Sequence, residues 1–123
     1  MSVAGVDTPS SISAFAARLA QASDAVTFED TMEVIAANYE FAPKPFTNGD
    51  VHNAAGTNEG SCKVFSFGKL AALDEASTLS CFGQHYRDVL ADPAGAAHAN
   101  IRSFMEAGWG GVHFPEGVAL TPK

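Results

Sequence analysis

One cysteine stands in a setting that could make a reactive thiol. Cys62 ends the run Asn-Glu-Gly-Ser-Cys of residues 58–62 and is followed by Lys63. If a helix begins near Cys62, the helix dipole and the backbone N–H groups of the first turn would favour the thiolate. The positive charge of Lys63 would add to this effect. The sequence therefore offers a nucleophile for thiol-dependent hydrolysis.

A nucleophilic thiol also needs a general base within hydrogen-bond reach and a group that orients the base. His98 or His85 could be the base, with Asn100 or Asp88 as the orienting group. The competing interpretation is structural, because a free cysteine is usually a small buried hydrophobe. No local signature of a known cysteine protease surrounds Cys62, which favours the structural interpretation.

The histidines do not form a metal-binding motif. They are His52, His85, His98 and His113. Their spacings match no compact set of metal ligands, and His85 and His98 are too far apart to share one face of a helix. Asp88 and Asp92 could add carboxylates to a mixed metal site, but their spacing gives no support for one. We therefore expect no metal and no cofactor, and we interpret the histidines as surface or core-edge residues.

A second polar set could form a binding surface. It consists of Asn48, Asn53, Asn58, Glu59, Arg87, Asn100 and Arg102. The alternative is a structural role, since asparagines tie loop backbones and buried arginines pair with carboxylates. Binding residues often lie on loops that a rigid scaffold holds. On that interpretation the contact surface lies on residues 46–61.

Composition and charge narrow the class of protein. A chain of 123 residues that is 46 % hydrophobic and 17 % charged is typical of one globular domain. Its formal net charge of −7 argues against nucleic acid and membranes as partners. Two cysteines are too few for a disulfide framework, and the N-terminus does not resemble a secretory signal. We expect a soluble monomer made in a reducing cytosol, with a protein or small molecule as its partner.

The apolar periodicity predicts a mainly α, single compact domain of about five helices that would position these groups. The helices are expected at about residues 12–20, 28–39, 62–72, 74–90 and 98–107. Ser11, Thr27 and Asp74 are the expected N-caps. Residues 1–11 should be frayed, and residues 12–123 should form the domain.

The predicted helix 74–90 has the clearest pattern and should be the centre of the core. Its apolar face consists of Leu79, Phe82, Tyr86, Val89 and Leu90. The helices of residues 28–39 and 98–107 should pack on this face, the latter through Ile101, Phe104 and Met105. Gln84 lies on the opposite side of the helix and should contribute little to stability.

Three segments do not show a clear helical period. Residues 40–61 contain two prolines and an Asn48-Gly49 turn signal, and they predict a long ordered loop. Residues 62–73 fit both a strand and a helix, of which we favour the helix. Residues 112–120 predict a small C-terminal β-hairpin with Gly117 in the left-handed position.

Four blocks of the sequence form an ordered series: YEFAPKPFTNG (39–49), NAAGTNEGSCKVF (53–65), CFGQHYRDVL (81–90) and HANIRSFM (98–105), with Gly108-Trp109 following. Together these blocks closely resemble the HopJ type III effector family. The resemblance covers about residues 26–120. The chain departs from the family pattern at Ala97, where the family has an aspartate, and at His85, where it has an aromatic residue. These departures weaken any catalytic scheme that uses either position.

The resemblance implies a bacterial protein that acts in the cytoplasm or is delivered into a host cell by type III secretion. It brings no established activity, so it implies no catalytic residue. Two hypotheses follow. The preferred one is a non-enzymatic binding protein that uses the loop of residues 46–61. The alternative is a thiol-dependent hydrolase with Cys62 as nucleophile and His98 as base.

Overall fold

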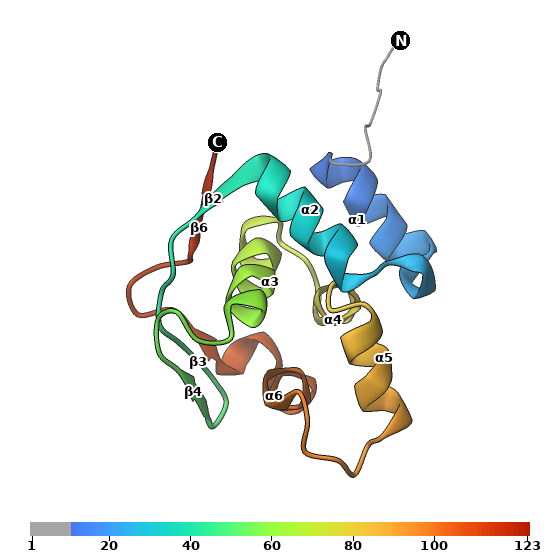
Figure 1. Ribbon diagram of the computed structural model, residues 1–123, viewed down its shortest axis with the longest axis vertical. Coiled ribbons are helices and arrows are strands. Elements are labelled where there is room, and N and C mark those ends of the chain that lie inside the picture. Colours follow the sequence, from blue (N-terminus) through green and yellow to red (C-terminus); the bar gives the residue numbers. More distant parts are fainter. Residues whose placement is uncertain (1–10) are drawn as a thin grey trace.

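The computed structural model describes residues 11–123, and this part of the chain is mainly α-helical, as predicted (Figure 1). Its helices are α1 (Ile12–Gln21), α2 (Phe28–Asn38), α3 (Glu59–Leu70), α4 (Glu75–Ser80), α5 (Gln84–Ala91) and α6 (Ala99–Ala107), with 3₁₀ helices η1 (Ser23–Ala25) and η2 (Gly108–Gly111). Its strands are β2 (Tyr39–Phe41), β3 (Phe46–Asn48), β4 (Val51–Asn53), β5 (Val112–His113) and β6 (Leu120–Pro122). None of the helices within residues 11–123 has the length and apolar character needed to cross a bilayer. Except for Ser11, the predicted frayed segment lies outside the described residues.

The N-caps expected from the sequence are present. Ser11 Oγ accepts a hydrogen bond from the Ala14 N–H at 3.0 Å, and the side chain of Asp74 caps α4 in the same way. Thr27 and Asp30 form a reciprocal capping box, with each backbone N–H donating to the other side chain at 3.1 Å. One such cap stabilises a helix by about 1 kcal/mol. The starts of α1, α2 and α4 are therefore determined by local sequence.

Helix α3 lies at the centre of the fold (Figure 1). Six of its residues between positions 62 and 68 are buried, which places apolar side chains on more than one face. The Phe65 ring is fully buried and lies 5.0–6.2 Å from the rings of Phe46, Phe82, Phe104 and Trp109. The helical interpretation of residues 62–73 is confirmed. The central position belongs to α3, however, and not to the predicted helix 74–90.

That predicted helix is in fact two helices, α4 and α5, separated at Gly83. Gly83 has φ 59° and ψ −126°, a conformation that interrupts the helix. A Cβ at Gly83 would lie 2.4 Å from the Phe28 nitrogen and 2.6 Å from the Thr27 carbonyl carbon. The chain bends where the start of α2 contacts it. After the bend Leu90 is 52 % exposed, and Met105 on α6 is 43 % exposed, so the prediction that both face the core was wrong.

Residues 40–61 are ordered, as predicted, but they contain strands that the sequence did not indicate. Strands β3 and β4 form an antiparallel hairpin with Asn48 paired to Val51. The predicted turn is present, with Gly49 at φ 58°. Strand β5 pairs with the other side of β3, which gives a small sheet in the order β4-β3-β5. The sheet fixes the segment that leads into α3.

The prediction of a C-terminal hairpin was wrong. Strand β5 pairs with β3, and β6 pairs with β2, so the two tail strands have different partners. Gly117 does have a positive φ, 92°, in the turn between them. Alternation of apolar residues indicates a strand, but it does not identify the strand's partner.

Candidate functional site

The four predicted asparagines form one hydrogen-bonded network. Asn53 and Asn100 exchange two hydrogen bonds, of 3.0 and 3.2 Å, between their side-chain amides. Asn48 Nδ2 donates to the Asn100 carbonyl at 2.8 Å, and Asn58 Nδ2 donates to Asn53 Oδ1 at 2.7 Å. The network fastens the β3–β4 hairpin to α6 and to the start of α3. Three of its members are buried, and only Asn58 is exposed.

The charged members of the predicted set lie elsewhere. Arg87 Nη1 donates to the Val26 carbonyl at 3.2 Å, and Arg102 donates to the carbonyls of Ala97 and Pro93. Both arginines therefore bond to backbone oxygens in place of the carboxylates that the sequence suggested. Glu59 is exposed in the first turn of α3. These three residues hold or flank loops, and none of them lines the cleft between the starts of α3 and α6.

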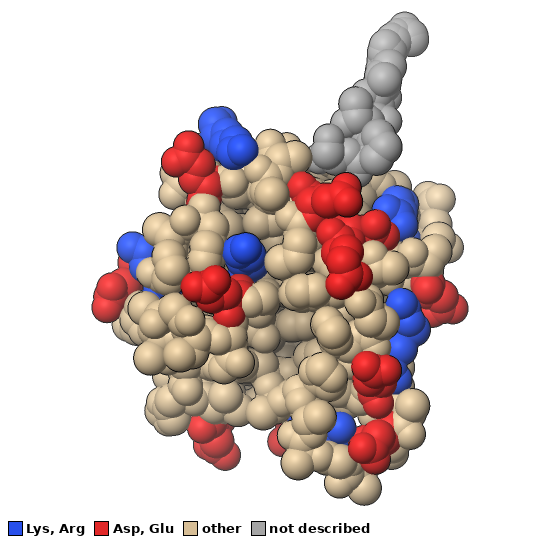
Figure 2. All heavy atoms as spheres, viewed as in Figure 1, with Lys and Arg blue, Asp and Glu red and all other residues tan. Residues whose placement is uncertain are grey.

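A cleft of about 260 Å³ opens between the starts of α3 and α6 and the junction of α4 with α5. Its polar lining comes from Asn58, Ser61, His85, His98 and Asn100, and its apolar lining from Phe28, Val51, Phe82 and Ile101. No Asp, Glu, Lys or Arg lines it among the described residues. Figure 2 shows the surface hollowed between α3 and the α5–α6 region, with mostly uncharged residues around the hollow.

Two helix N-termini contribute to this cleft. Residues 60–61 belong to the first turn of α3 and residues 99–100 to the first turn of α6. The side chains of the N-cap residues, Asn58 and His98, do not cap these helices. The first N–H groups of a helix have no acceptor within the helix, and they carry partial positive charge. The cleft therefore offers backbone hydrogen-bond donors from two helices.

The same two N-cap residues have an unusual backbone conformation. Asn58 has φ 48° and His98 has φ 60°, both in the left-handed region. The only other non-glycine residue with positive φ in residues 11–123 is Ala72. Asparagine and histidine adopt the left-handed region more readily than most residues with a side chain. Two of these three residues line the cleft, where their conformation sets the direction in which α3 and α6 begin.

His85 and His98 come from different elements, as their spacing required, yet they meet at the rim of the cleft. The ring centroids of His85 and His98 are 5.2 Å apart, because α5 and the start of α6 lie side by side after the turn of residues 92–97. The His85 ring also packs edge-on against Phe28 at 4.9 Å. His52 and His113 are exposed on β4 and β5.

Cys62 does not line the cleft. It is 2 % exposed, and its Sγ donates to the Lys44 carbonyl at 3.6 Å. Burial raises the pKa of the Cys62 thiol, and the charge of Glu59 adds to this, which outweighs the hydrogen bond to Lys44 and the charge of Lys63. A reactive thiolate needs the opposite, an exposed thiol with a lowered pKa. A helix does begin near Cys62, as expected, but burial of the thiol outweighs any lowering of its pKa by the helix start. The hydrolase hypothesis is therefore unsupported.

Several cleft residues were not singled out from the sequence. Phe28 had the pattern of a core residue of α2, and Ile101 had that of α6. Ser61 was placed just before the predicted start of α3, whereas α3 begins at Glu59. These side chains come from three helices that only tertiary packing brings together. The predicted helix starts were the one sequence feature that could have indicated these positions, because the first N–H groups of any helix are free hydrogen-bond donors.

Comparison with known proteins identifies a family. Residues 12–120 match the family model described as HopJ type III effector protein. A crystal structure of a protein of unknown function, VPA0580, has 47 % sequence identity and a TM-score of 0.89. That match covers 99 % of this chain and 100 % of the other. No curated protein matches the sequence.

Proposed function

We propose that this chain, which belongs to the HopJ type III effector protein family, is a binding protein whose cleft holds a small anionic ligand. The contact site comprises part of the 46–61 segment, through Val51, Asn58 and Ser61, and the facing starts of α5 and α6. The single observation that carries the proposal is the convergence of two uncapped helix N-termini on one cleft. Helix N-termini are common binding sites for phosphate and carboxylate groups.

The energy available from the helix dipoles is too small to account for binding, so direct hydrogen bonds would be the main source of affinity. A helix dipole stabilises a nearby negative charge by about 0.3–1 kcal/mol, so two helices supply only about 0.6–2 kcal/mol. A millimolar dissociation constant already requires about 4 kcal/mol. The remainder would come from the backbone N–H groups and from Asn58, Ser61 and the two histidines. Charge-assisted hydrogen bonds are about twice as strong as neutral ones.

The shape of the cleft restricts the ligand class. Its volume of about 260 Å³ is below the roughly 300–1,000 Å³ of sites for drug-sized ligands. Phe28, Phe82 and Ile101 give it an apolar wall beside the polar donors. A small phosphate or carboxylate that carries an apolar or aromatic group fits both features. The binding role is preferred to catalysis because the candidate nucleophile, Cys62, is buried away from the cleft.

The family description also supports a proposal about where the protein acts. We infer a bacterial cytoplasmic protein that can be delivered into a host cell by type III secretion, as the family's description suggests. The net charge of −7 supports partners other than nucleic acid and anionic membranes. We expect the chain to act as a monomer.

Calorimetric titration with three matched probes tests the ligand class. Phenyl phosphate offers both the anion and the aromatic ring, orthophosphate only the anion, and phenol only the ring. The protein is treated with EDTA so that metal plays no part. We expect phenyl phosphate to bind most tightly and phenol to bind least. Absence of phenyl phosphate binding at millimolar concentration would overturn the proposal.

A charge variant tests the location. Ser61→Asp adds a negative charge to the first turn of α3, inside the cleft. Like charges about 4 Å apart repel by roughly 1–4 kcal/mol, so affinity should fall at least about fivefold. Ser13→Asp, in the exposed first turn of α1, is the matched control and should bind as the unmodified chain does. Equal binding by both variants would place the ligand elsewhere.

A further inference from the structure

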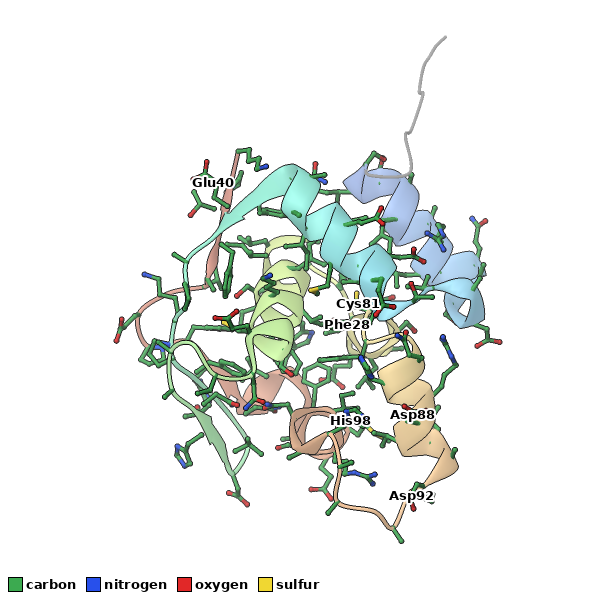
Figure 3. The ribbon with its side chains drawn as sticks, in the orientation of Figure 1. Phe28, Glu40, Cys81, Asp88, Asp92 and His98 are labelled. Atoms are coloured by element: carbon green, nitrogen blue, oxygen red, sulfur yellow. The ribbon has the colours of Figure 1, made fainter. Side chains whose placement is uncertain are left out.

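Two histidines and an aspartate meet at the outer rim of the cleft. One ligand atom each of His85, Asp88 and His98 lies within 4.8 Å of the other two. His85 is half-buried, whereas Asp88 and His98 are exposed. Figure 3 shows Asp88 beside His98, with Asp92 farther along toward the end of α5. Two imidazoles and one carboxylate are a donor set that divalent transition metals bind in proteins.

The fold explains why these three residues meet. His85 and Asp88 are three residues apart on α5, so their side chains lie on the same face of that helix. His98 is the N-cap of α6, and the turn between the two helices returns it to α5. Arg102 donates to the carbonyls of Ala97 and Pro93, which fastens that turn to α6. His98 directly follows this turn, and its own carbonyl accepts a hydrogen bond from the Arg102 N–H at 3.1 Å.

We propose that His85, Asp88 and His98 form a binding site for a divalent transition metal, with zinc as the best match. The proposal concerns the metal alone and stands whether or not the cleft binds an organic anion. It goes beyond the sequence, in which the spacing of these residues resembles no metal motif. It also goes beyond the family description, which names no metal.

The distances are compatible with zinc after small side-chain rotations. Zinc–ligand bonds of about 2.0–2.2 Å place the ligand atoms of a tetrahedral site roughly 3.3–3.5 Å apart. The three atoms here lie within 4.8 Å, so the ligands must move closer by about an ångström. Asp88 and His98 are exposed and can rotate at little cost. The more constrained ligand, His85, is already oriented by its edge-on contact with Phe28.

Three protein ligands leave a coordination position open. Tetrahedral sites with three protein ligands bind water or an exogenous group at the fourth position. His85 and His98 line the cleft, so that fourth position would face the cleft or its mouth. Calcium and magnesium prefer oxygen ligands and are poor matches for two imidazoles. Zinc should therefore bind more tightly than either of them.

Calorimetric titration of the untagged chain with zinc chloride, in buffer without phosphate, tests the site. We expect one zinc ion per chain in the unmodified protein. The variants His85→Phe, Asp88→Asn and His98→Asn should each weaken binding at least tenfold, since loss even of a supporting partner of a metal ligand costs about 10–100-fold. Phenylalanine keeps a ring against Phe28, and asparagine tolerates the left-handed backbone of residue 98.

The matched control is the double variant His52→Asn/His113→Asn, which removes the exposed histidines of β4 and β5. It should bind zinc as the unmodified chain does. Thermal melts without metal show whether each variant folds, and the exposed position of Asp88 makes Asp88→Asn the safest of the three. Zinc binding that survives Asp88→Asn and His98→Asn, or that is lost in the double variant, would overturn the proposal. So would a chain that binds no zinc.

Discussion

Asn53 on β4 and Asn100 on α6 form a reciprocal pair of side-chain hydrogen bonds, 3.0 and 3.2 Å long, although 47 positions separate them in the sequence. Both residues are buried, with exposed fractions of 3 % and 6 %. The pair joins the hairpin to the helix whose first turn lines the cleft. The geometry of the candidate site therefore depends on a buried polar contact as well as on the phenylalanine core.

Replacing Asn100 by alanine should destabilise the protein by about 1–3 kcal/mol. The substitution leaves the buried amide of Asn53 without one donor and one acceptor, and an unsatisfied buried polar group costs about that much. Thr57→Ala is the control, because the Thr57 hydroxyl donates only to the Ala54 carbonyl in an exposed turn among the described contacts, and its loss should change stability by less than about 0.5 kcal/mol. Urea unfolding of both variants measures the difference. Equal midpoints would show that the amide pair contributes nothing.

Gly83→Ala should be among the most destabilising small substitutions in the chain. The added Cβ would lie 2.4–2.8 Å from backbone atoms of Thr27 and Phe28, at a positive φ that alanine disfavours. Gly110→Ala adds the same methyl group where no atom lies within 4 Å. We expect a large fall in melting temperature for Gly83→Ala and almost none for Gly110→Ala. Similar melting temperatures for the two would mean that α2 and α5 are not in close contact.

Phe82→Ala should cost about 3–5 kcal/mol, the usual range for truncating a buried phenylalanine. Phe82 is 2 % exposed, and its ring lies 5.6 Å from that of Phe65. Leu90→Ala, at a position that is 52 % exposed, is the control and should change little. Guanidinium unfolding curves provide the comparison. Comparable losses from the two substitutions would contradict the core described here.

Gln84 was expected to contribute little to stability, but its side chain has two hydrogen-bond partners on another helix. Its Oε1 accepts a hydrogen bond from the Phe28 N–H, and its Nε2 donates to the Glu29 carboxylate, both at 2.9 Å. The side chain therefore joins α5 to the start of α2. It faces away from the core, as its helical position indicated, but its partner on a distant helix was not visible in the sequence.

Stability should fall as the pH rises above about 9, and Cys81 should account for part of that fall. Burial raises the pKa of the Cys81 thiol to about 12 from an ordinary value near 9. The folded state therefore binds this proton more tightly than the unfolded state does, and the stabilisation is present below pH 9 and lost between about 9 and 12. Unfolding free energies of the unmodified chain and of Cys81→Ala across this range test the claim. Parallel curves would contradict it.

The local features of the fold were predictable, and the long-range ones were not. The caps at Ser11, Thr27 and Asp74 depend on residues within three positions, so their side-chain chemistry is visible in the sequence. The break at Gly83 depends on contact with α2, more than fifty positions away. The pairing of β5 with β3 depends on backbone hydrogen bonds that carry no residue-type signal. A regular apolar period therefore predicted one helix where packing produces two.

The candidate site shows the same division. Asn58, Asn100 and His98 were predicted as candidate site residues from their residue types, and all three line the cleft. The proximity of His85 to His98 follows from the turn between α5 and α6, and their separation in the sequence suggested the opposite. Cys62 drew attention by its place near a helix start, but whether that start is exposed or buried is decided by tertiary packing.

Two-dimensional ¹⁵N–¹H NMR during a titration with phenyl phosphate shows, residue by residue, whether the cleft binds a small anion at its two helix N-termini. We expect the largest amide shifts at Gly60, Ser61, Ala99 and Asn100, because their N–H groups would face the bound anion. The amides around the exposed Leu90 and Met105 should not move. Saturating shifts confined to the first turns of α3 and α6 would support anion binding in this cleft, whereas shifts elsewhere or no shifts at all would contradict it.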